Sequence, residues 1–151
     1  MRIAIVSGGF SPIHGGHVEY MERASRKCMS QNPKVICILN NKNWLVKKKG
    51  YEFLPEIDRK KIIEAFWFRP KVILSSHEKD CVDISVNKEL RLIREMYPAD
   101  ELFFCKGGDR FENEIPESKT CAELGITIID GLGEKINSSS ELVRRAREYI
   151  T

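Results

Sequence analysis

The chain has 151 residues, of which 42% are hydrophobic and 31% charged. That length predicts a single domain over residues 1–151 with a buried core, and its formal charge of +3 does not argue for a nucleic-acid partner. Five cysteines without a C-x-x-C pair, and the lack of any apolar run of membrane-spanning length, predict a cytoplasmic protein with no disulfide framework and no membrane partner.

Apolar and amphipathic runs alternate along the chain. Short β-branched or aromatic runs, bounded by glycine or polar residues, predict strands over 2–7, 34–40, 71–76, 101–106 and 126–130. Apolar residues at helical spacing, together with start and stop signals, predict helices over 16–28, 55–68, 84–97, 118–124 and 138–150. The polar, lysine-rich segment 41–54 is expected to be a loop.

This alternation with short connections predicts an α/β fold, a single doubly wound, Rossmann-like domain with a five-stranded, mainly parallel sheet. In such sheets ligands bind at the carboxyl ends of the strands. Three unusual segments, 8–17, 41–54 and 106–113, each follow a predicted strand at that edge. We therefore expect the functional site there.

The stretch SGGFSPIHGGH, residues 7–17, combines two glycine pairs with two histidines three residues apart. It matches a dinucleotide fingerprint poorly, because the second strand ends in asparagines at 40–41 instead of an acid that would hold a ribose. As a zinc site, His14 and His17 need a further ligand, and only His77, from another loop, could approach. Phosphate chemistry fits better, because glycines and a helix N-terminus present amides to an anion and histidines donate to phosphoryl oxygens.

The HGGH at residues 14–17 resembles the signature of the H-x-G-H nucleotidyltransferase superfamily, and the resemblance covers nearly the whole chain. It includes the lysine-rich segment 41–54, the KGGD turn at 106–109 and the serine run 138–140. The chain is most similar to heptose-phosphate adenylyltransferases and glycerol-phosphate cytidylyltransferases. This resemblance implies transfer of AMP or CMP from ATP or CTP to a small sugar- or polyol-phosphate acceptor, with release of pyrophosphate. It also implies Mg²⁺ carried mainly by the triphosphate, and a homodimer.

Carried over by position, the resemblance assigns catalytic roles at the triphosphate to His14, His17 and Lys49. The further residues that it assigns to nucleotide binding are Gly8, Gly9, Phe10, Lys47, Arg59, Gly107, Asp109, Ser138, Ser139 and Ser140. From its own surroundings in the sequence, Arg59 could equally pair with an acid on its own helix. No pair of carboxylates suggests a metal cage, so no metal ligand is assigned.

Two alternatives stay open. The G-x-F-x-P-x-H pattern at residues 8–14 is nearer to the nicotinamide-mononucleotide and phosphopantetheine adenylyltransferases, and Trp44 offers a flat acceptor a stacking platform. The other alternative is a non-catalytic nucleotide-binding module on the same fold. Both histidines and the serine run argue against that module, because binding alone would not require both.

Overall fold

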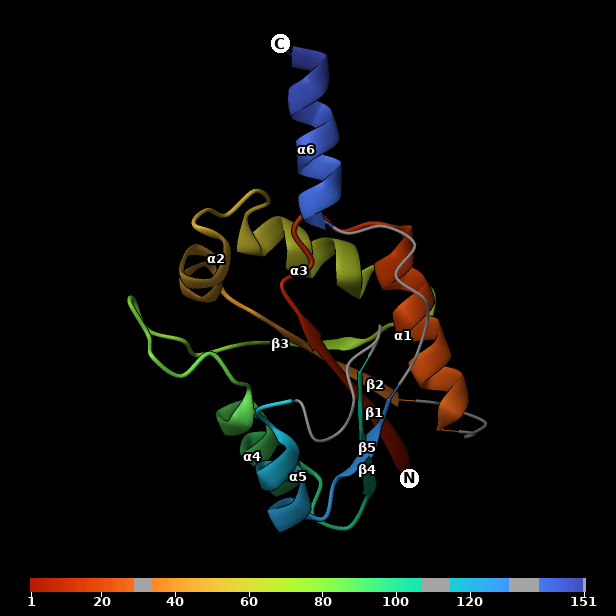
Figure 1. Cartoon of the computed structure of the whole chain (residues 1–151). Helices are drawn as coiled ribbons and strands as arrows, with labels where there is room; N and C mark the ends of the chain where they lie inside the picture. The colour runs from red at the N-terminus through yellow and green to blue at the C-terminus, as the bar shows by residue number, and fades with distance from the viewer. Residues whose placement is uncertain (29–33, 107–114, 131–138, 151) are drawn as a thin grey trace.

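A computed structural model describes residues 1–28, 34–106, 115–130 and 139–150 (Figure 1). The strands in these residues are β1 (Arg2–Gly8), β2 (Lys34–Leu39), β3 (Lys71–Leu74), β4 (Glu101–Cys105) and β5 (Thr127–Ile129). The helices are α1 (Gly15–Lys27), α2 (Lys42–Lys49), α3 (Glu56–Glu64), α4 (Asn87–Met96), α5 (Ser118–Leu124) and α6 (Ser139–Ile150).

All five strands form one sheet in the order β3-β2-β1-β4-β5, and every neighbouring pair is parallel. The central strand is β1, where Ile5 lies opposite Ile36 of β2 and Phe104 of β4. The chain builds outward from β1 to β3, then returns to add β4 and β5 on the other side. The predicted five-stranded α/β sheet is confirmed, and its switch point lies at the end of β1, where such folds bind ligands.

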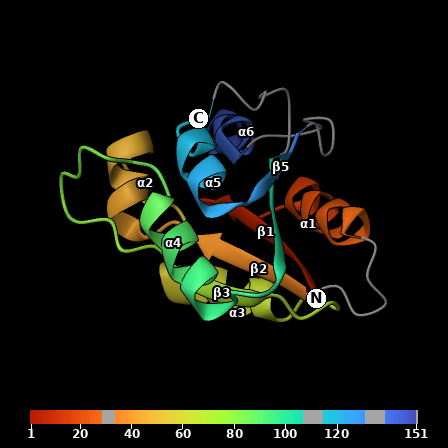
Figure 2. The same ribbon diagram turned by 90° about the horizontal axis from the view of Figure 1, so that it is seen from below.

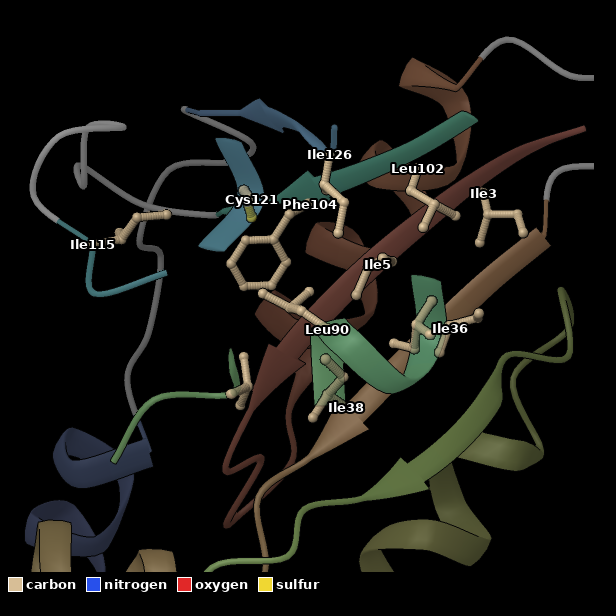
Figure 3. Close-up of a cluster of buried hydrophobic side chains, with 12 residues drawn as sticks. Ile3, Ile5, Ile36, Ile38, Leu90, Leu102, Phe104, Ile115, Cys121 and Ile126 are labelled. Atoms are coloured by element: carbon tan, nitrogen blue, oxygen red, sulfur yellow. The ribbon is translucent and has the colours of Figure 1, made fainter. Parts of the chain in front are cut away.

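The sheet is covered on both faces because apolar side chains alternate along its strands. Ile3 and Ile5 point to the face packed by α4 and α5 (Figure 3), and Ala4 and Val6 point to the face packed by α1 and α3. Figure 2, seen from below, shows α4 in front of the sheet. Continuous apolar runs, buried on both faces, are what parallel strands require.

Segment 41–54 differs from its prediction, because residues 42–49 form the helix α2 and not a loop. Asn41 caps its start by accepting a hydrogen bond from the Trp44 amide at 3.0 Å. Gly50 ends it in the left-handed conformation, with φ of 88°. Only Leu45 is buried, so the helix has little apolar periodicity, and its formation depends on these caps and on lysines near its negative end.

The last helix, α6, extends away from the sheet and ends at the C-terminus (Figure 1). Its residues from Arg144 to Tyr149 are exposed. Within the described segments, no helix is both long and apolar enough to cross a membrane.

Candidate active site

The chain leaves β1 through Gly8 and Gly9, and both positions are crowded. A Cβ atom on Gly8 would lie 2.9 Å from the ring of Phe10, and one on Gly9 would lie 2.8 Å from Leu45 of α2. Phe10 has a φ of 48° and is only 4% exposed, because its ring folds back into the core. Close packing therefore accounts for the glycine pair, and the contact of these residues with a nucleotide stays a prediction.

His14 and His17 cap the start of α1 reciprocally. The Nδ1 atom of His14 accepts a hydrogen bond from the Gly16 amide at 3.0 Å, and the Nδ1 atom of His17 accepts one from the His14 amide at 3.2 Å. The two rings are stacked, with their centroids 3.9 Å apart. Because a ring nitrogen that accepts from an amide carries no proton, both neutral rings hold their proton on Nε2. The cap thus turns two Nε2–H donors outward from the backbone.

Both histidines are neutral at pH 7. Burial, then the nearby His14, then Lys49 lower the pKa of His17 to about 3. Burial and, to a smaller extent, Lys49 also lower the pKa of His14. The Nε2 atom of His14 is buried and has no hydrogen-bond partner in the part of the chain that the structure describes. This pair therefore offers hydrogen-bond donors without a net charge.

The third residue of the HGGH sequence is glycine for a steric reason. A Cβ atom on Gly16 would lie 2.9 Å from Cε1 and 3.1 Å from Nδ1 of the His14 ring. No heavy atom would lie within 4 Å of a Cβ on the neighbouring Gly15. Only Gly16 is needed to let the His14 ring fold over the helix start.

The three lysines that end α2 are not equivalent. Lys47 and Lys48 are exposed, whereas Lys49 is half-buried, and its charge lowers the pKa of both histidines. Of the lysines 47–49, Lys49 is therefore the one whose charge acts on the histidine pair. The catalytic role of Lys49 and its contact with phosphate remain predictions.

Arg59 is fully buried below this loop. Its guanidinium donates to the carbonyls of Gly9 at 2.8 Å and Asn40 at 2.6 Å. It also donates to the carbonyl of Leu54 at 2.8 Å and to the carboxylate of Glu52 at 3.0 Å. In this conformation Arg59 joins the ends of β1 and β2 to segment 50–55, and its predicted contact with a nucleotide stays a prediction.

The remaining predicted residues lie in, or directly beside, segments that the structure does not describe. Gly107, Asp109 and Ser138 fall outside the described residues. Ser139 and Ser140 are the first two residues of α6, as expected for a serine run that opens the last helix.

His77 does not join the other histidines as a zinc ligand. Its Nδ1 is 2.8 Å from the Ser75 hydroxyl and its Nε2 is 2.8 Å from the Ser85 carbonyl, so both ring nitrogens hold its own loop in place. Among the described residues, no three His, Cys, Asp or Glu side chains are grouped so that they could hold a metal ion.

Sequence reasoning missed a small cavity at the same edge of the sheet, which we call the strand-end recess. Its volume is 180 Å³, and its walls include Ser7, Asn40, Trp44, Val86, Lys106 and Glu117. Ser7, Asn40 and Lys106 stand at or just beyond the carboxyl ends of β1, β2 and β4. That position could have singled them out, because Ser7 and Lys106 begin the sequences SGGFSPIHGGH and KGGD, and Asn40 ends the second predicted strand.

Two neutral imidazole donors at a helix N-terminus, beside a lysine and at the switch point of a parallel sheet, define an α/β domain suited to binding phosphoryl groups. The model of the cytidylyltransferase-like family matches residues 5–146. The chain therefore belongs to that family and is a nucleotidyltransferase.

Solved structures agree in fold. A lipopolysaccharide core biosynthesis protein from Thermoplasma volcanium GSS1 is 20% identical over 89% of this chain and 98% of its own, with a TM-score of 0.59. A bifunctional NMN adenylyltransferase/ADP ribose pyrophosphatase from Francisella tularensis is 16% identical, with a TM-score of 0.70 over 97% of this chain and 42% of its own.

A protein from Vibrio parahaemolyticus, assigned as a nicotinate-nucleotide adenylyltransferase, is 21% identical over 98% of this chain and 88% of its own, with a TM-score of 0.62. At these identities the three structures establish the fold alone. A comparison with curated protein sequences gave no significant match.

Proposed function

We propose that the protein transfers AMP or CMP from ATP or CTP to a phosphorylated sugar or polyol and releases pyrophosphate. The observation that carries this proposal is the reciprocal cap of α1. It fixes both histidines in one tautomer and leaves their Nε2–H groups as donors, and burial, with the charge of Lys49, lowers the pKa of both so that they are neutral. Donors fixed in place before the reaction stabilise a transition state without reorganising.

In the proposed reaction an oxygen of the acceptor phosphate attacks the α-phosphorus in line. The bond between the α-phosphorus and the oxygen that bridges to the β-phosphate breaks, and pyrophosphate leaves with that electron pair. His14 and His17 donate to the phosphoryl oxygens as their negative charge grows, and Lys49 balances part of that charge. No covalent intermediate with the protein is needed, because positioning and charge stabilisation suffice.

The magnesium complex of the triphosphate is the substrate in this proposal. Magnesium binds phosphate oxygens and retains several waters, so it does not require a dedicated set of protein ligands.

For the acceptor, a sugar or polyol phosphate is supported by the KGGD sequence at residues 106–109 and by the fold similarity to a protein of lipopolysaccharide core biosynthesis. Nicotinamide mononucleotide is the second candidate. It is supported by the fold similarity to the Francisella and Vibrio proteins and by the G-x-F-x-P-x-H pattern at residues 8–14.

The test is a pyrophosphate-release screen of four nucleoside triphosphates with Mg²⁺. The acceptors are glycerol 3-phosphate, several sugar phosphates, nicotinamide mononucleotide and phosphopantetheine. Release with ATP or CTP and one sugar or polyol phosphate is expected. Release with nicotinamide mononucleotide alone would establish the second candidate. Binding of a triphosphate without release for any pair would instead indicate the non-catalytic module. Light scattering on the same sample tests the predicted homodimer.

A further inference from the structure

The strand-end recess lies on the opposite side of β1 from the histidine pair. Its walls are the ends of β1, β2 and β4, residues of α2, and the segments that lead into α4 and α5. The histidines stand on α1, which covers the other face of the sheet. A ligand that spans the end of β1 would therefore reach both, with one part in the recess and another beside the cap.

Two oxygen atoms of residues that line the recess lack hydrogen-bond donors in the described part of the chain. Asn40 is 3% exposed, and its Oδ1 has no partner there. Glu117 is 5% exposed; its Oε1 accepts from the Val86 amide at 3.3 Å, whereas its Oε2 has no partner. Buried acceptors without donors destabilise a fold, so such atoms indicate a missing partner.

The recess is also lined by two lysines, Lys48 and Lys106, and by an apolar wall. The Lys106 ammonium donates to the Ser7 hydroxyl at 3.2 Å and lies 4.7 Å from the centre of the Phe104 ring. Trp44 forms part of the wall, and its ring is fixed by a bond from its Nε1 to the Ile84 carbonyl at 2.9 Å. Polar groups of both kinds beside an aromatic surface suit a ligand with hydroxyl groups on a short carbon chain.

Other ligand chemistries fit the recess less well. A phosphate or carboxylate could pair with Lys48 or Lys106, which both line the recess, but it would supply no proton to Asn40 Oδ1 and would meet the carboxylate of Glu117. A flat apolar group would leave both acceptors unsatisfied. Hydroxyl groups donate to such acceptors and also accept from an ammonium. A volume of 180 Å³ holds about six waters at ~30 Å³ each, which corresponds to a small polyol fragment.

We propose that the strand-end recess binds the hydroxyl-bearing part of the acceptor, with Asn40 and Glu117 accepting from its hydroxyl groups and Lys106 donating to one. The acceptor phosphate then lies toward His14, His17 and Lys49. This proposal rests on the proposed function and names the residues that select a sugar or polyol phosphate. A larger cleft of 350 Å³ is lined by residues 76–83, 85, 88 and 89 alone, without a strand-end residue, and is a weaker candidate.

The test uses Asn40→Ala and Glu117→Gln, with Asn87→Ala as the matched control. Asn87 also has a side-chain oxygen without a partner in the described residues, but it does not line the recess. We expect Asn40→Ala to raise the KM for the sugar or polyol phosphate by about tenfold or more, with the KM for the triphosphate unchanged. Asn87→Ala should change neither KM.

Thermal unfolding separates recognition from a structural role. Asn40 Oδ1 makes no hydrogen bond in the described residues that Asn40→Ala could break, and an unsatisfied buried acceptor is itself costly, so this variant should keep or raise the melting temperature. Asn41→Ala should lower it, because the Asn41 amide donates to the carbonyls of Ser75 and His77 at 3.1 and 2.8 Å. A lower melting temperature for Asn40→Ala, with an unchanged KM for the acceptor, would overturn the proposal.

Calorimetric titration with glycerol 3-phosphate and the sugar phosphates, against inorganic phosphate as the probe without hydroxyl groups, keeps the two proposals separate. If the wild type turns over a sugar or polyol phosphate and both recess variants match it, the recess proposal fails and the function stands. If no pair turns over, the proposed function fails. In that case, binding of a sugar or polyol phosphate that Asn40→Ala weakens would still support the recess proposal. Binding that Asn40→Ala leaves unchanged, or no binding at all, would overturn the recess proposal. Turnover of nicotinamide mononucleotide alone would overturn the sugar or polyol class.

Discussion

The guanidinium of Arg59 and the carbonyl of Gly9 are joined by a hydrogen bond of 2.8 Å across 50 positions of the sequence. Through this bond, helix α3 holds the loop that leads from β1 to the histidines. The Ser11 hydroxyl adds a second tie by accepting from the Leu54 amide at 2.9 Å. The position of the cap at the start of α1 therefore depends on Arg59 and on the backbone at Leu54, which both follow it in the sequence.

Replacing Arg59 with methionine should destabilise the fold by about 3–5 kcal/mol, the usual cost of removing one partner of a buried ion pair. Three carbonyls and Glu52 would lose their donor. Urea unfolding measures this loss. Glu52→Gln is the control and should cost less, because Glu52 is partly exposed and its amide oxygen can still accept. An unchanged unfolding midpoint together with weaker triphosphate binding would show that Arg59 contacts the nucleotide.

His14 has two roles that different substitutions separate. His14→Asn keeps a side-chain acceptor for the Gly16 amide and removes the Nε2 donor, whereas His14→Ala removes both. We expect both variants to lower kcat by the ~10²–10³ typical of losing one placed donor. Only His14→Ala should also lose about 1 kcal/mol of stability, the usual value of an N-cap. Near-native turnover in His14→Asn would contradict the assigned catalytic role.

The two glycines of the HGGH sequence should respond differently to alanine. Gly16→Ala forces the new Cβ against the His14 ring, so we expect lower activity as the ring moves from its place over the helix. Gly15→Ala meets no atom within 4 Å, and alanine stabilises helices relative to glycine. It should therefore leave the rate unchanged and slightly raise the melting temperature. Equal losses in both variants would show that the crowding at Gly16 is not the cause.

Much of the fold follows from local sequence. The strands were predicted because β-branched runs stop at glycine or polar residues, and parallel pairing followed from the alternation with helices. The helix α2 was missed because its segment is polar and buries only Leu45. Its caps, Asn41 and Gly50, read equally well as turn residues.

The site was predicted where one segment contains it and missed where distant segments meet. The HGGH sequence lies on one helix start, so its pairing of rings is local. The strand-end recess joins residues from three strand ends, and nothing in the sequence states their register. Arg59 had neighbouring acids on its own helix, but its guanidinium instead reaches Glu52 and three carbonyls, because Arg59 lies with Ile63 on the buried face of that helix.

The stability of the protein should depend on His17 in mild acid. The pKa of His17 is about 3 in the folded state, against an ordinary value of 6.5. Below pH 6.5 the unfolded chain therefore takes up a proton that the folded protein does not, and stability falls as the pH falls from about 6.5 toward 3. The slope from this one group is at most about 1.4 kcal/mol per pH unit.

The variant that isolates this effect is His17→Gln, because glutamine at the same helix position reaches back to the cap amide without titrating. Urea midpoints at pH 7.5 and pH 5 should show a larger loss for the wild type than for His17→Gln. Carboxylates titrate alike in both proteins and cancel in the comparison. Parallel pH profiles would show that His17 is not held neutral by the fold.

The last prediction concerns the lysines that end α2. Lys49→Gln should weaken triphosphate binding by about tenfold and raise the pKa of both histidines, because the positive charge that lowers them is removed. Lys47→Gln removes the same charge from an exposed position in the same turn, where salt screens it, so it should change neither. Calorimetry measures the affinity, and NMR titration of the imidazole protons measures the pKa. If Lys47→Gln reproduced both effects, the lysines would act as a diffuse positive field. If Lys49→Gln alone produces both effects, a single ammonium in a fixed position lowers the pKa of both histidines and binds the triphosphate.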